Sequence, residues 1–81
     1  MGGYLFFVLF IGVDTLDLHG TLHEDAEYTI HRFIYRCGFP CKIITGHSDR
    51  MKEIAKKTIH EYDLKWHYEN YANYGCLVVT E

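Results

Sequence analysis

The five residues from Leu16 to Gly20 constrain the fold more than any other stretch, because they predict a β-strand that ends in a tight turn. Residues two apart on a strand point to the same face, so Leu16 and Leu18 share one face. Asp17 and His19 share the other. The leucines can then lie beneath a helical layer, while a carboxylate and an imidazole stand together at the carboxyl end of the strand. Gly20 frees the backbone to turn.

The chain has 81 residues, of which 48% are hydrophobic, and this predicts one small domain with a modest core. Its formal net charge of −3 argues against a generally basic protein that coats nucleic acid, so phosphate binding would need a local patch. The three cysteines, Cys37, Cys41 and Cys76, have no metal-like spacing, and their odd number argues against a disulfide framework. We therefore expect free, buried thiols and a reducing, cytoplasmic setting.

The hydrophobic periodicity of the chain predicts six elements in the order β-α-β-α-β-β. The predicted strands cover residues 13–19, 41–45, 64–71 and 76–80, and the predicted helices cover residues 21–37 and 48–62. Thr21 and Glu24 predict a capping box for the first helix, and Ser48 or Asp49 is expected to cap the second. Right-handed crossovers would place both helices on one face of a mixed four-stranded sheet. The predicted fold class is thus a two-layer α/β sandwich with one open sheet face.

Residues 1–12 form an apolar N-terminal extension to this domain, which itself covers residues 13–81. The apolar run over 4–11 is too short to span a bilayer, which needs about 20 residues, and it lacks the features of a secretory signal. We favour an extra strand or an extension of the first strand. The alternatives are a self-association surface, which would make a homodimer, and a segment foreign to the natural domain. No membrane partner is expected.

Asp17 and His19 are the first candidates for chemistry. A histidine exchanges protons near neutral pH, which suits general acid–base catalysis. A carboxylate on the same strand face would orient the histidine or hold a divalent metal ion such as Mg²⁺ or Mn²⁺. A local hydrogen-bonding arrangement is the simpler interpretation of the pair. A zinc site that combines Asp17 and His19 with His47 is geometrically possible but less favoured.

A second candidate lies where the next predicted strand runs into a helix. The amino terminus of a helix presents free backbone N–H groups and a partial positive charge, so it attracts phosphate. A glycine there allows a ligand to approach the backbone closely. Basic residues in the first turn are unfavourable for the helix itself, and this cost favours the binding of an anionic partner. A capped helix with a solvated basic face is the alternative. The candidate phosphate-binding residues are Thr45, Gly46, His47, Ser48, Arg50 and Lys52, together with Gly20 of the first turn.

Topology brings the two candidates together. The strands of a βαβ unit are parallel and usually adjacent, so their carboxyl ends lie at one edge of the sheet, where open α/β sheets bind ligands. We therefore expect His19 and His47 to converge on one site.

The chain resembles the Smr (small MutS-related) domain family over roughly residues 13–80. The segment 16–20 matches the signature LDLHG in full, and residues 43–48 resemble a second family motif in which a strand ends in a Gly-rich turn. Gly75 and residues 76–80 are similar to the closing turn and strand. The second motif departs from the family pattern because Thr45-Gly46 runs directly into His47-Ser48, which makes the turn shorter.

The resemblance implies a nucleic-acid-binding domain with endonuclease activity on RNA or DNA, and a fold similar to the C-terminal domain of a bacterial translation initiation factor. It implies Asp17 and His19 as the catalytic pair, and Gly46, His47 and Ser48 as the phosphate-holding turn. The ribosome is a further partner that it implies. The alternative is a binding module without catalysis, which docks on structured RNA, DNA or the ribosome.

Overall fold

The computed structural model describes residues 13–70 and 72–81. The order of the elements confirms the prediction of a β-α-β-α-β-β chain. The elements are β1 (Thr15–Asp17), α2 (His23–Arg36), β2 (Cys41–Ile44), α3 (Asp49–Glu61), β3 (Lys65–Asn70) and β4 (Asn73–Thr80).

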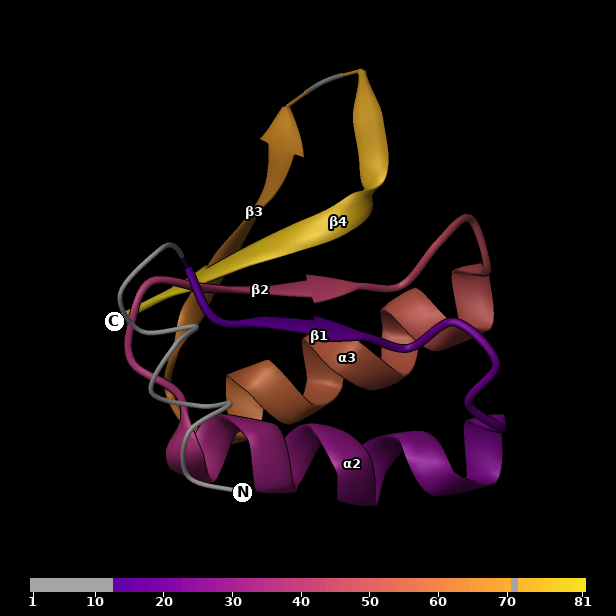
Figure 1. Ribbon diagram of the computed structural model, residues 1–81, viewed down its shortest axis with the longest axis horizontal. Coiled ribbons are helices and arrows are strands. Elements are labelled where there is room, and N and C mark those ends of the chain that lie inside the picture. Colours follow the sequence, from indigo (N-terminus) through magenta and orange to yellow (C-terminus); the bar gives the residue numbers. More distant parts are fainter. Residues whose placement is uncertain (1–12, 71) are drawn as a thin grey trace.

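The four strands form one mixed sheet in the order β1-β2-β4-β3. Strands β1 and β2 are parallel, with Asp17 opposite Ile44, and β4 runs antiparallel to both of its neighbours. Both helices lie on the same side of this sheet, as Figure 1 shows, so the predicted two-layer sandwich is confirmed. The predicted hairpin of the last two strands is confirmed as well.

The hydrophobic core lies between the sheet and the helical layer. Strand β2 shows why, because Cys41 and Ile43 are fully buried while Lys42 and Ile44 are half-buried on the other face. This alternation is typical of a strand that covers helices with one face only. The largest fully buried apolar side chains are Ile30, Ile43, Ile59, Leu77 and Val79.

The start of α2 corrects one prediction. The helix begins at His23 rather than at residue 21, and its N-cap is Leu22, whose side chain cannot accept a hydrogen bond. Thr21 instead belongs to the preceding turn, because its N–H donates to the carbonyl oxygen of Leu18 at 2.9 Å. The predicted capping box of Thr21 and Glu24 is therefore wrong. The first strand is also shorter than predicted, since β1 covers three residues.

The prediction of free thiols is confirmed. All three cysteines are free, with Cys41 and Cys76 buried and Cys37 half-buried. The Cys37 thiol donates to the Cys41 sulfur at a distance of 3.2 Å between the two sulfur atoms. Burial raises the pKa of all three thiols above its ordinary value, so they are protonated at neutral pH.

The apolar segment 4–11 lies outside the described residues, so the extra strand and the homodimer stay predictions. Tyr71 in the β3–β4 turn is also outside them. Within residues 13–70 and 72–81, the helices are too short and too polar to cross a membrane.

Candidate functional site

The first turn of the site follows β1 and is shaped by Asp17. Its carboxylate Oδ1 accepts a hydrogen bond from the backbone N–H of His19 at 2.9 Å. Gly20 then adopts a positive φ of 81°, a conformation that favours glycine. The Asp17 carboxylate therefore fixes the backbone that carries His19, and both side chains are exposed to solvent. This contact makes Asp17 a residue that shapes the turn, whatever further role it has.

The second turn follows β2 and is held by the last strand. The N–H groups of Thr45 and Gly46 both donate to the carbonyl oxygen of Gly75, at 2.8 and 3.1 Å. A Cβ atom on Gly75 would lie 3.3 Å from the backbone of Gly46, so the two chain segments approach closely. The buried Thr45 hydroxyl donates to the carbonyl oxygen of Gly46 at 3.0 Å. These contacts give Thr45 and Gly75 a structural role in this turn.

Ser48 caps α3, which decides between the two predicted caps. Its hydroxyl accepts a hydrogen bond from the N–H of Met51 at 3.1 Å, and its backbone carbonyl accepts one from Lys52 at 3.0 Å. An N-cap of this kind satisfies one of the free donors at the start of a helix. Other N–H groups at the start of a helix have no partner within the helix.

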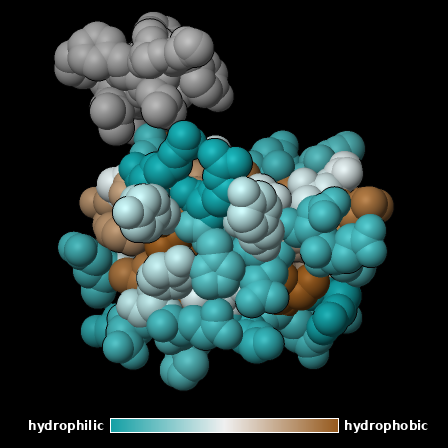
Figure 2. Space-filling model, turned by 90° about the horizontal axis from the view of Figure 1, so that it is seen from below, coloured by the Kyte–Doolittle hydropathy of each residue, from teal (hydrophilic) through white to brown (hydrophobic). Residues whose placement is uncertain are grey.

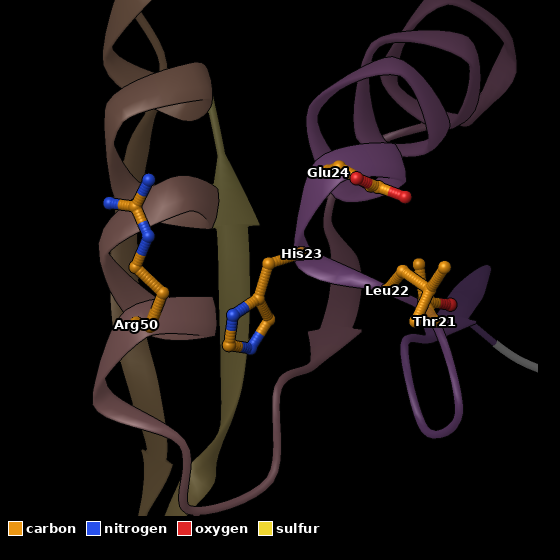
Figure 3. Close-up of a pocket in the computed structure, with 5 residues that line it drawn as sticks. All are labelled: Thr21, Leu22, His23, Glu24 and Arg50. Carbon is orange, nitrogen blue, oxygen red and sulfur yellow. The ribbon is translucent and has the colours of Figure 1, made fainter.

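The two turns meet at one edge of the sheet, as the parallel pairing of β1 and β2 requires (Figure 1). A shallow pocket of about 630 Å³ lies between the starts of the two helices. In Figure 3 the His23 ring points from the start of α2 towards α3, where Arg50 lies, while Glu24 is on the side away from Arg50. The Nε2 atom of His23 is 3.5 Å from the Ser48 hydroxyl. The pocket is lined by Thr21, Leu22, His23, Glu24 and Arg50.

The structure thus brings together some of the predicted residues and leaves others at the margin. Arg50 lines the pocket and Ser48 lies beside it, whereas His19, Gly20 and His47 belong to the flanking turns. The guanidinium of Arg50 is 3.2 Å from the Glu53 carboxylate, and its side chain is 64% exposed. Arg50 is therefore accessible to an anion.

His23 is a pocket residue that the sequence analysis did not select. It lies four residues after His19, but the two do not form a regular helical pair because His19 precedes the helix. The signal that identifies His23 is topological: parallel neighbouring strands place the first turn of both following helices at the same edge. The first residue of α2 therefore faces the first turn of α3.

The charges around the pocket are mixed. Arg50 carries a positive charge, but Glu24 lines the same pocket, and Asp25 and Asp49 also lie in the first turns of the two helices. Acidic residues here stabilise the helices through their dipoles and at the same time reduce the attraction for an anion.

The shortest ion pair among the described residues lies away from the pocket, on the open face of the sheet. Lys42 Nζ is 2.8 Å from Glu69 Oε2. The Glu69 carboxylate raises the pKa of Lys42, and the ammonium of Lys42 lowers the pKa of Glu69. The pair links β2 to β3 across the intervening strand β4.

No family model matches the chain, and no similar protein was found among the curated proteins or the solved structures.

Proposed function

We propose that this domain binds nucleic acid in the manner of an Smr domain, at the edge where β1 and β2 end, and that it cleaves a phosphodiester of RNA or DNA. One observation carries the proposal. In two strand–glycine–helix units, the parallel strands end at the same edge of the sheet. A pocket bordered by His23, Ser48 and Arg50 lies there, between the starts of the two helices. Smr-like motifs in the sequence fall on these two turns.

A phosphate group would be held by the start of α3. The free N–H groups of its first turn and the positive end of its dipole attract an anion, and the exposed Arg50 guanidinium adds two donors. His47 and Lys52 lie close in sequence to this site. Because Glu24 and Asp49 oppose the attraction, we expect binding to be weak and strongly dependent on salt.

His19 is the proposed general acid or base. It is exposed at the carboxyl end of β1, so a bound phosphodiester can reach it. Asp17 positions His19 through the hydrogen bond to its backbone. As an exposed carboxylate, Asp17 is also the proposed ligand of a divalent cation such as Mg²⁺ or Mn²⁺, which would stabilise the negative charge of the transition state.

A cleavage assay tests this proposal. Labelled single-stranded and structured RNA and DNA are incubated with the protein, with and without EDTA. We expect His19→Ala to abolish cleavage, whereas His67→Ala, a change at an exposed histidine of β3, leaves it unchanged. Asp17→Asn keeps an oxygen for the turn but removes the charge, so it separates the two roles of Asp17. Equal cleavage by wild type and His19→Ala would overturn the assignment.

The second candidate function is a module that binds RNA, DNA or the ribosome without cleavage. It is favoured by the Asp17 contact, because that carboxylate is already bonded to the backbone of its own turn. This candidate predicts a salt-dependent gel shift without turnover under any metal condition. Arg50→Ala should weaken binding and reduce the slope of log K against log salt by about 1 if Arg50 contacts a phosphate. Lys57→Ala, an exposed site on the same helix, is the matched control.

A further inference from the structure

A second cluster of charged side chains lies on the helical layer and is unrelated to the proposed nucleic-acid site. Among the described residues, Glu27, His31 and Glu61 each place one ligand atom within 4.8 Å of the other two. Glu27 and His31 lie one turn apart on α2, and Glu61 is the last residue of α3. Figure 2 shows the helical face from outside, where hydrophilic side chains predominate.

We propose that Glu27, His31 and Glu61 form a site for a divalent transition-metal ion, with Zn²⁺ as the best fit. A nitrogen donor and two carboxylate oxygens are a ligand set that zinc accepts, with water in the fourth position. Mg²⁺ prefers six oxygen ligands and is not expected to bind here.

Two of the three distances between the donor atoms are close to those that this ion requires. The Nε2 atom of His31 is 3.6 Å from Glu27 Oε2 and 3.8 Å from Glu61 Oε1. Ligand atoms at the corners of a tetrahedron around zinc stand about 3.3–3.6 Å apart, as bond lengths of about 2.0–2.2 Å require. Small rotations of the two glutamate side chains, which are about half exposed, would close the remaining difference.

A contact outside the three ligands orients the histidine. The Nδ1 atom of His31 is 2.7 Å from the hydroxyl of Tyr62, and the two rings lie with their centroids 5.4 Å apart. When Nδ1–H donates to this hydroxyl, Nε2 keeps its lone pair and directs it at the two carboxylates. A hydrogen bond from the second ring nitrogen is the usual way in which proteins fix a metal-binding histidine. Tyr62 is therefore a positioning residue for this site.

The charges of the cluster also favour a cation. Among the ion pairs of the described residues, both Glu27 and Glu61 pair with His31. With the imidazole neutral, two carboxylates face one uncharged ring, and a divalent cation would neutralise both. Since the ligands come from α2 and α3, the ion would join the two helices in the folded state only. Zinc binding should therefore raise the thermal stability.

Thermal unfolding of the full chain with ZnCl₂ tests the site. At a zinc concentration a hundred times its dissociation constant, we expect Tm to rise by roughly 10–20 °C, and MgCl₂ to have no such effect. The rise should be lost in His31→Ala and in Glu61→Gln. The rise should persist in His60→Ala and in Glu53→Gln, which change exposed residues of α3.

Calorimetric titration of the folded protein with zinc measures affinity directly. Tyr62→Phe removes the orienting hydroxyl but keeps the ring, so we expect the affinity to fall 10- to 100-fold while the apo protein stays folded. An unchanged Tm, or an equal rise in His31→Ala, would overturn the proposal. Binding that is lost in Cys37→Ser and retained in His31→Ala would assign the metal to the thiol pair instead and would also overturn it.

Discussion

At the scale of single residues, the site depends on two glycines in a backbone conformation that other residues adopt at a cost. Gly20 and Gly46 have φ values of 81° and 70°. Each follows the end of a parallel strand and lets the chain reverse towards a helix. The turns around them are completed by one carboxylate, Asp17, and one carbonyl, that of Gly75.

We predict that Gly46→Ala lowers the free energy of unfolding by about 1–2 kcal/mol, because an L-residue in the left-handed region carries a steric penalty of this size. The space around Gly46 is open, so the effect would report the backbone alone. Gly38→Ala is the control, since Gly38 also faces open space and has no positive φ. Urea unfolding measures both. Equal losses in the two variants would contradict the prediction.

At the scale of elements, the two helices begin in different ways. Helix α3 has a side-chain cap, Ser48, whereas the N-cap of α2 is Leu22. The sequence predicted a cap for both. Thr21 fails as a cap because the turn after β1 uses its N–H, and this places Thr21 two residues before the helix. The start of the helix thus depends on the hydrogen bonds of the preceding turn, which the spacing of Thr21 and Glu24 does not predict.

We predict that Ser48→Ala destabilises the protein by about 1 kcal/mol, as is typical for the loss of a serine N-cap. Thr21→Ala should cost much less, since the hydrogen bond of Thr21 to Leu18 comes from its backbone and survives the change. Thermal unfolding monitored by circular dichroism at the helical band compares the two. A larger loss in Thr21→Ala than in Ser48→Ala would restore the capping box.

The ion pair of Lys42 and Glu69 joins two strands that do not pair directly, so it belongs to the sheet as an element. Because the ammonium of Lys42 lowers the pKa of Glu69, the contribution of this carboxylate to stability is present above its unfolded pKa. This contribution is lost as the pH falls through the pKa of Glu69 in the folded state, which is lower.

We therefore predict that Glu69→Gln flattens the loss of stability below about pH 4.3, the ordinary pKa of a glutamate. Urea midpoints measured between neutral pH and acid would show this. The control is Glu53→Gln, which removes a carboxylate that pairs with Arg50 within one helix. If the urea midpoint falls equally steeply with decreasing pH in wild type and in Glu69→Gln, the proposed role of the ion pair is refuted.

At the scale of the whole molecule, the sequence was sufficient for the element order, the sheet type and the position of both helices on one face. Those features follow from periodicity and from the handedness of crossovers. The pocket was harder to predict. His23 enters it because it is the first residue of α2 and because α3 starts at the same edge.

The cluster of Glu27, His31 and Glu61 shows the same limit. The spacing of Glu27 and His31 is visible in the sequence as one turn of a helix. Glu61 joins them through the packing of α2 against α3, which no local pattern encodes. Local patterns thus predicted the type and order of the elements, while the sites depend on where separate elements meet.

The most direct measurement is a map of backbone amide chemical shifts, recorded while a short single-stranded RNA or DNA is added to the labelled protein. The central claim is that nucleic acid binds at the edge where β1 and β2 end. It predicts shift changes concentrated in residues 19–24 and 46–50, reduced in Arg50→Ala. Changes concentrated instead on the open sheet face, around Lys65 and His67, would contradict the claim, and so would the absence of any change at low salt.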